Sequence, residues 1–173
     1  MDIFWEELTA GMPTARQLAQ IIIRLLAATL LGAAIGIQRE RVGKPAGLRT
    51  HTLVTLGTCV FVIAGGAYGM SSDGLSRVIQ GIVTGIGFIG AGSILKLNEE
   101  RDIQGLTTAA GVWMASAIGV AVGLGALGLA ILATILTLII LTLVGRIEFQ
   151  INKRQLSEGK PTTTSQTGVN DDE

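Results

Sequence analysis

The stretch GIVTGIGFIGAGSIL, residues 81–95, decides the fold that this sequence predicts. It lies in a segment without charged side chains, residues 78–95, which is long enough to cross the hydrocarbon core of a bilayer as a helix. Five of its fifteen residues are glycine, and such a helix would be poor in water. In lipid, the bilayer enforces helix formation, and glycine lets a neighbouring helix approach until the backbones touch. We therefore predict a membrane helix that is the central and most closely surrounded helix of a bundle.

The composition of the whole chain also indicates an integral membrane protein. Of its 173 residues, 49% are hydrophobic and 15% are charged, and the mean hydropathy is +0.56. Soluble domains carry about 25% charged residues. No charged residue lies between Asp102 and Arg146, and that interval suits two membrane helices joined by a tight turn. The predicted fold class is all-α, a polytopic membrane bundle.

The apolar segments predict about five transmembrane helices in one domain. The predicted helices are residues 18–37, 50–68, 78–95, 106–124 and 127–144. Together they form a transmembrane domain over residues 18–147. Residues 1–17 are predicted to be an interfacial segment, with Phe4 and Trp5 suited to the headgroup zone. Residues 148–173 are predicted to be a polar cytoplasmic tail without stable structure.

The distribution of Lys and Arg predicts the orientation in the membrane. Five helices place the first and third loops on the same side as the C-terminus. That side carries ten basic residues: Arg39, Arg41, Lys44, Arg49, Lys96, Arg101, Arg146, Lys153, Arg154 and Lys160. The other side carries Arg16 and Arg77. Because basic residues accumulate on the cytoplasmic side, we predict an N-terminus outside and a cytoplasmic C-terminus.

Glycine recurs at helical spacing in three of the predicted helices and indicates close helix packing. The candidate packing residues are Gly32, Gly36, Gly81, Gly85, Gly87, Gly90, Gly92, Gly111 and Gly119.

Polar residues gather at helix ends on the predicted cytoplasmic side. This candidate functional cluster consists of Arg39, Glu40, Arg49, Thr50, His51, Thr107 and Thr108. Several of them open a helix, where free N–H groups and the helix dipole favour anions or carbonyl oxygens. The alternative is that the charged members only set the topology and start the helices, although topology does not require the acidic Glu40.

Two polar residues lie inside predicted membrane helices. Arg24 is about two turns inside the first helix, where a charge is costly. Its side chain either reaches the outer interface or meets a polar group of another helix, such as Gln80 or Asp73. Gln80 lines the interior of the bundle or makes an interhelical hydrogen bond.

Several kinds of chemistry find no support in the sequence. Cys59 and His51 are the only residues of their types, so one chain holds neither a disulfide nor a Cys or His metal cluster. The pattern G-x-G-x-x-G at residues 85–90 matches a dinucleotide fingerprint but lacks the preceding strand that this motif requires. We expect no enzyme activity, no metal site, no cofactor and no nucleic-acid partner.

Three stretches resemble the membrane domain of the MgtC/SapB family of bacterial inner-membrane proteins. They are LLAATLLGAAIGIQRERVGKPAGLRTHTLVTLG (25–57), GIGFIGAGSIL (85–95) and IQGLTTAAGVWMASAIGVAVGLG (103–125). The resemblance covers residues from about 20 to 145 and implies five helices with the N-terminus outside. The polar signature of the family falls on residues 39–40, 47–51 and 105–108. Longer members add a C-terminal cytoplasmic domain, in place of which this sequence has a short polar tail.

The resemblance also implies a role. The members look like regulators of larger membrane complexes, among them the proton-translocating ATP synthase or a transporter, linked to magnesium limitation, acid stress and survival in host cells. The alternative is a homo-oligomeric transporter or channel for Mg²⁺ or another small ion. Such a transporter would need oxygen ligands, and the predicted helices contain no buried acidic residue.

Overall fold

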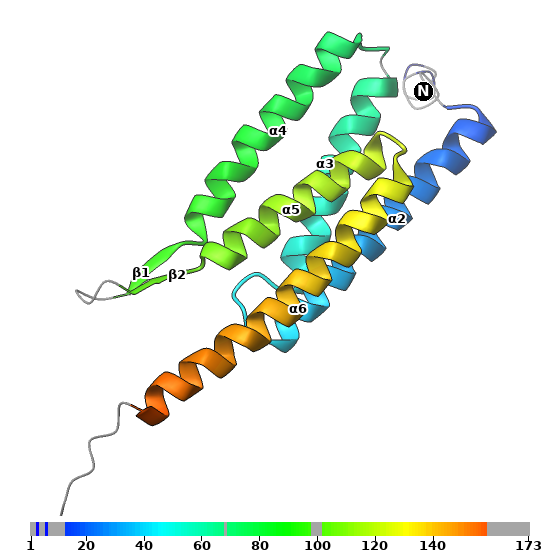
Figure 1. Cartoon of the computed structure of the whole chain (residues 1–173). Helices are drawn as coiled ribbons and strands as arrows, with labels where there is room; N and C mark the ends of the chain where they lie inside the picture. Colours follow the sequence, from blue (N-terminus) through cyan, green and yellow to red (C-terminus); the bar gives the residue numbers. More distant parts are fainter. Residues whose placement is uncertain (1–2, 4–5, 7–12, 68, 98–101, 159–173) are drawn as a thin grey trace, which may run out of the picture. The chain divides into compact units, whose positions relative to one another are not determined.

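The structure is a computed structural model that describes residues 3, 6, 13–67, 69–97 and 102–158. In these residues the chain forms five long helices and a short hairpin (Figure 1). The helices are α2 (Ala15–Arg41), α3 (Leu48–Ala67), α4 (Ser72–Gly92), α5 (Leu106–Gly123) and α6 (Leu127–Glu158). The predicted all-α class is confirmed. Helices α2 to α5 are each long and apolar enough to cross a membrane, and α6 contains a shorter apolar stretch, Leu127–Leu143.

The chain divides into two compact units, Met1–Leu138 and Ile139–Glu173. The first unit contains α2 to α5 and the hairpin, and α6 begins within it. Helix α6 continues to Glu158, so residues 148–158 are helical, although the sequence predicts them to be part of an unstructured tail. Residues 159–173 of the predicted tail, and most of the predicted interfacial segment, lie outside the described residues. The orientation of the termini stays a prediction.

Side-chain caps fix where two of the helices begin. At the start of α2, the Gln17 amide donates to Thr14 Oγ1 at 3.3 Å, and the Thr14 amide donates to Gln17 Oε1 at 2.9 Å. At the start of α4, Ser71 Oγ accepts from the Gly74 amide at 3.2 Å. Such caps satisfy N–H groups that have no partner within the helix. Both helices therefore begin several residues before the predicted apolar spans.

Glycine in the left-handed region closes two of the turns. Gly43 (φ 66°) follows α2, and Gly125 (φ 84°) separates α5 from α6. Beyond Gly125, the Ala126 amide donates to the Ala121 carbonyl at 2.9 Å, which is the bond of a Schellman motif. This motif makes the tight turn that the sequence predicts between the last two membrane helices.

The segment between α4 and α5 differs from the loop that the sequence predicts. It contains two antiparallel strands, β1 (Leu95–Leu97) and β2 (Asp102–Gln104), with Lys96 opposite Ile103. Because β1 starts at Leu95, α4 ends at Gly92, earlier than the predicted end. Gly105 (φ 97°) connects the hairpin to α5 in a conformation that residues with a side chain rarely adopt.

Helix α3 is packed between α2 and α5, and glycine permits both contacts. A Cβ atom at Gly36 of α2 would lie 2.6 Å from Leu48 Cα of α3. A Cβ atom at Gly119 of α5 would collide with the Thr58 hydroxyl and the Thr55 carbonyl of α3. The backbones are therefore as close as helices allow, and α3 with its two neighbours forms the core of the first unit.

The prediction that residues 81–95 form the central helix is wrong. In the most apolar part of α4, 11% of the residues are buried, compared with 56% in α5. Figure 1 shows α4 along the outside of the α3 and α5 pair. Among the described residues, no atom beyond the adjacent backbone of α4 lies within 4 Å of a Cβ atom placed at Gly81, Gly85, Gly87 or Gly92. The glycine-rich helix is peripheral, and its small-residue face is unfilled by the described part of the chain.

Candidate functional site

The end of α2 and the start of α5 meet through a buried arginine. Arg39 lies in the last turn of α2 and is 3% exposed. Its Nη2 donates to Thr108 Oγ1 at 2.8 Å, and Thr108 is the third residue of α5. The structure thus brings together two members of the predicted polar cluster that are 69 residues apart in sequence.

His51 lies in the first turn of α3 and is fully buried. Its Nδ1 is 2.9 Å from the Gly47 carbonyl oxygen, and because a carbonyl only accepts, Nδ1 carries the proton. The other ring nitrogen, Nε2, faces Gly111 of α5, where a Cβ atom would lie 3.3 Å away. No partner for Nε2 is found among the described residues. Glycine at position 111 therefore makes room for the imidazole between α3 and α5.

Glu40 caps the start of α3. Its Oε2 accepts from the Leu48 amide at 3.0 Å, and a Cβ atom at Gly47 would lie 3.0 Å from the same oxygen. A carboxylate at this position satisfies a free N–H group and interacts well with the helix dipole. Among the described residues, no three His, Cys, Asp or Glu side chains are grouped as a metal site would require.

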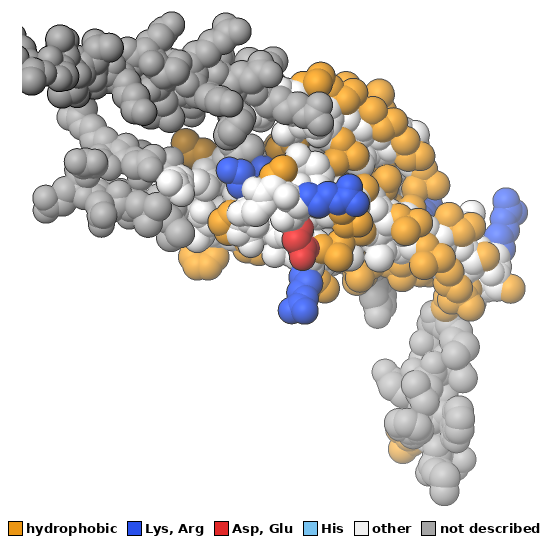
Figure 2. Space-filling view, turned by 90° about the horizontal axis from the view of Figure 1, so that it is seen from below, with side chains coloured by type: hydrophobic (Ala, Val, Ile, Leu, Met, Phe, Trp, Pro, Cys, Tyr) orange, Lys and Arg blue, Asp and Glu red, His pale blue; other side chains and the backbone are white. Residues whose placement is uncertain are grey.

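The remaining members of the predicted cluster are on the surface or only partly covered. Arg49 and Thr107 are exposed, and Thr50 is half-buried. Figure 2 shows this end of the first unit, with Lys and Arg side chains around one acidic side chain. The exposed charges of the α2–α3 turn and of the start of α3 are Glu40, Arg41, Lys44 and Arg49. The cluster therefore has a buried part, Arg39, His51 and Thr108, and a basic outer part.

Arg24 meets the opposite end of α5. Its Nη1 donates to the Gly123 carbonyl at 2.9 Å, and a Cβ atom at Gly125 would lie 2.7 Å from Nη2. The last carbonyl groups of a helix lack partners within the helix and carry partial negative charge, so a guanidinium is favoured there. The expected partners Gln80 and Asp73 are wrong. Gln80 is exposed, and its carbonyl accepts from Thr84 Oγ1 at 2.9 Å.

The structure divides the predicted packing glycines into two groups. Gly32, Gly36, Gly111 and Gly119 face atoms of α3, and Gly90 faces Ala109 of α5 at 3.6 Å. Gly81, Gly85, Gly87 and Gly92 face open space, as described above. The sequence predicts that the second group packs against other helices of the bundle, and among the described residues it does not.

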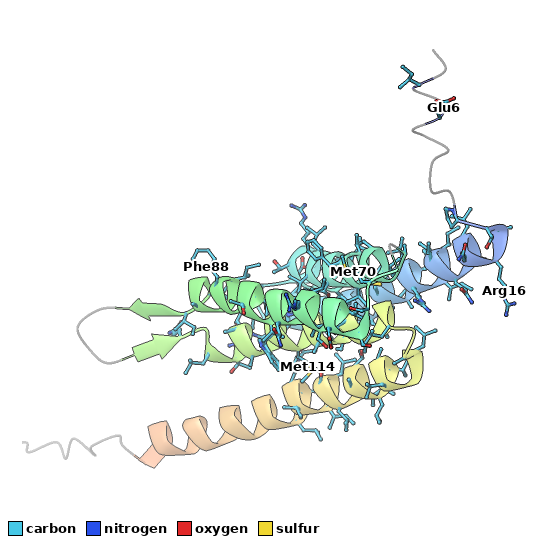
Figure 3. The ribbon with its side chains drawn as sticks, turned by 90° about the horizontal axis from the view of Figure 1, so that it is seen from above. Glu6, Arg16, Met70, Phe88 and Met114 are labelled. Carbon is cyan, nitrogen blue, oxygen red and sulfur yellow. The ribbon has the colours of Figure 1, made fainter. Side chains whose placement is uncertain are left out.

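An apolar groove lies between α3 and α4 and encloses about 570 Å³. The residues that line it are Leu53, Val54, Gly57, Thr58, Phe61, Val78, Gly81, Ile82, Gly85, Ile86 and Ile89. Two of the unfilled glycines, Gly81 and Gly85, thus form part of its wall. Phe88 is 84% exposed and points away from the neighbouring helices (Figure 3). The groove cannot be recognised from the sequence alone, because it opens only when α4 is peripheral.

Comparison with known proteins identifies the family. The model of the MgtC family matches residues 25–150, which include the whole of α3, α4 and α5 and the residues of the buried cluster. This chain belongs to the MgtC family. The matched range also contains the unfilled glycines and the groove, whereas Arg24 lies just before it.

Three named bacterial relatives of this MgtC family protein show the extent of the similarity. The "Putative magnesium transporter YhiD" of Escherichia coli K12 is 44% identical over 140 residues, which are 77% of this chain and 64% of YhiD. Protein SrpB of Synechococcus elongatus is 42% identical over 130 residues, 69% of this chain and 71% of SrpB. Protein MgtC of Salmonella typhimurium is 42% identical over 136 residues, 79% of this chain and 57% of MgtC. No solved structure matches the chain.

Proposed function

We propose that this protein is a non-enzymatic regulator in the bacterial inner membrane, which binds a transmembrane helix of a larger membrane complex in the α3–α4 groove. The observation that carries the proposal is the contrast between its glycines. Those of α2 and α5 are filled by α3, whereas Gly81 and Gly85 of α4 line an apolar groove and have no atom within 4 Å of a Cβ atom.

The physics of helix association in lipid supports a helix as the occupant. Lipid tails are as apolar as leucine, so helices associate in a bilayer mainly through close packing, which small residues permit. The groove wall offers Gly57 on α3 opposite Gly81 and Gly85 on α4. We infer an apolar partner helix with small residues on its contacting face. The resemblance favours a subunit of the ATP synthase or of a transporter, in a role linked to magnesium limitation or acid stress.

The alternative function is transport of Mg²⁺ or another small ion by a homo-oligomer. The name of YhiD, a putative magnesium transporter, favours this alternative. The described residues favour it less, because a dehydrated Mg²⁺ is held by oxygen ligands, often carboxylates. Glu40 is engaged at the start of α3, and the nearby buried charge, Arg39, is a cation that would repel Mg²⁺.

A pair of glycine variants tests the regulator. Gly85→Leu fills the groove, whereas Gly87→Leu adds the same bulk at a glycine that is outside the groove and also has free space. We expect Gly85→Leu to lower the recovery of a co-purifying complex at least about tenfold, since leucine blocks close approach. Gly87→Leu is expected to leave the recovery unchanged. Equal recovery with both variants, each folded, would reject the groove as the docking site.

A crosslinking experiment separates the regulator from the alternative. A photoreactive residue at position 82 lies in the groove wall, and the same residue at Phe88 points away from it. We expect position 82 to crosslink to a transmembrane helix of another protein, and position 88 to crosslink mainly to lipid. Crosslinks between copies of this chain, together with Mg²⁺ flux in liposomes that Glu40→Gln abolishes, would favour the transporter.

A further inference from the structure

The buried part of the polar cluster contains a cation whose bonding is incomplete. Arg39 is 3% exposed, and its guanidinium can donate five hydrogen bonds. Its Nη2 bonds to Thr108 Oγ1, but no partner for its Nε is found among the described residues.

The described residues also provide no negative charge for Arg39. Glu40, the next residue in sequence, directs its Oε2 to the Leu48 amide. A buried charge is costly unless it is paired, and removing one member of a buried pair leaves an uncompensated charge. The buried guanidinium therefore indicates that an anion from elsewhere completes the site.

The start of α5 adds positive potential at the same place. Its N-cap is Gly105, which has no side chain to cap the helix. The first intrahelical bond is from the Ala109 amide to the Gly105 carbonyl, at 2.8 Å, so the amides of residues 106–108 precede it. A helix N-terminus with free amides binds anions, and phosphate is a common ligand there. Because Arg39 contacts Thr108, its charge reinforces this helix end.

The first turn of α5 is also within reach of a ligand. Leu106 and Thr107 are exposed, while Thr108 is buried against Arg39. The exposed cations Arg41, Lys44 and Arg49 occupy the α2–α3 turn and the start of α3, and such charges raise the local concentration of anions. A ligand would thus approach from the basic surface and meet the buried cation behind the helix end.

We propose that the first turn of α5, backed by Arg39, binds a phosphate group. The amides of Thr107 and Thr108 and the Thr108 hydroxyl donate to the phosphate oxygens, and Arg39 supplies the compensating charge. The phosphate belongs to an anionic lipid headgroup or to free inorganic phosphate, since both present the same oxygens. This site is separate from the α3–α4 groove and does not depend on the regulatory function.

Two probes distinguish the sources in protein purified in maltoside detergent, which carries no phosphate. In the first arm, inorganic phosphate is titrated and thermal unfolding is followed. In the second, phosphatidylglycerol is added and the bound lipid is counted by native mass spectrometry. We expect saturable binding of either inorganic phosphate or phosphatidylglycerol. Absence of binding in both arms, with the protein folded, would overturn the proposal.

Variants connect the binding to the proposed residues. Arg39→Gln is expected to weaken binding at least about tenfold, since a charged hydrogen-bond partner is lost. Thr108→Val, which preserves the shape of the side chain, should weaken binding several-fold and keeps the test valid where Arg39→Gln does not fold. Arg77→Gln is the control, because Arg77 is an exposed cation near the start of α4 and is not part of the basic surface described above, and binding should change less than about threefold. Equal losses in all three variants would indicate diffuse attraction and reject the site.

Two further variants separate this proposal from its competitors. Gly85→Leu changes the groove only, so phosphate binding should persist when partner binding is lost. Glu99, Glu100 and Asp102 belong to the segment that precedes α5, and their carboxylates are the competing anions within the chain. If phosphate bound only after all three were changed to amides, the chain itself would supply the anion and the proposal would be wrong.

Discussion

Helices α5 and α4 carry similar glycine patterns but use them differently. In α5, Gly111, Gly119 and Gly123 face α3, and a Cβ atom at Gly123 would lie 2.7 Å from Val62 Cβ. In α4, Gly81 and Gly85 face a groove. The difference lies in α3, which presents Thr55, Thr58 and backbone to α5, whereas its groove side combines Leu53 and Phe61 with the small Gly57. Glycine spacing therefore predicts a face suited to close packing, and the neighbouring helix decides whether the chain fills it.

The side of α3 that faces α5 differs in burial from the side that faces the groove. On the α5 side, His51, Thr55, Thr58 and Val62 recur every three or four residues and are buried. On the groove side, Leu53 is 66% exposed and Phe61 is 61% exposed. These large side chains line the groove and are mostly uncovered by α4.

The largest effect is expected from Gly119→Ala. The added methyl group would overlap the Thr58 hydroxyl and the Thr55 carbonyl, and backbone atoms cannot move away as a flexible side chain would. We expect a loss of about 3 kcal/mol in unfolding free energy, at the upper end of typical overpacking effects. Unfolding in mixed micelles with increasing dodecyl sulfate would measure it. A variant as stable as the parent would show that α3 and α5 are not in close contact.

The next effect concerns the two ends of α5, both of which are met by arginines of α2. Arg24→Met removes the hydrogen bond to the Gly123 carbonyl and leaves that carbonyl without its charged partner. We expect a loss of about 2 kcal/mol, in the range for hydrogen bonds to charged groups. The same unfolding assay measures it, with Arg16→Met as the control, because Arg16 points away from the bundle (Figure 3). Equal losses in the two variants would show that Arg24 has no special contact.

Much of the fold could be predicted from the sequence because the bilayer imposes strong constraints. The length of the apolar segments identified α2 to α5. The observed start of α5 agrees with the predicted start at residue 106, because Gly105 marks the end of the polar segment. The helix starts at Ala15 and Ser72 were missed, since capping by Thr14 and Ser71 acts outside the apolar span. The order of helices in the bundle could not be predicted, because glycine content alone does not distinguish a filled face from an open one.

The candidate site could be predicted only as a set of residues. The family signature indicated Arg39, His51 and Thr108, but the bond between Arg39 and Thr108 joins helices that are distant in sequence. The partner of Arg24 was missed for a different reason. It is the backbone carbonyl of Gly123, and a backbone acceptor leaves no trace in the identity of the residue. The helical spacing of His51, Thr55 and Thr58 on α3 was the signal available in the sequence for the central helix.

A smaller effect is expected from Glu40→Ala, which removes the acceptor for the Leu48 amide at the start of α3. The loss of a helix cap costs about 1 kcal/mol. Glu40→Gln keeps an oxygen at the same place, so we expect it to lose about half as much as the alanine variant. Thermal unfolding of the three proteins in one detergent would measure the series. A larger loss for glutamine than for alanine would contradict a capping role for Glu40.

The smallest effect is expected from Gly85→Ala in the isolated protein. A Cβ atom at Gly85 has no atom within 4 Å, so the methyl group would displace only lipid or detergent. Substitutions away from packed features change the unfolding free energy by about 0.5 kcal/mol at most. Gly119→Ala is the same chemical change in a neighbouring helix. The two variants together thus span most of the expected range of losses in unfolding free energy. If Gly85→Ala lost as much as Gly119→Ala, the groove would be closed by the chain itself, and a partner helix would have no place to bind.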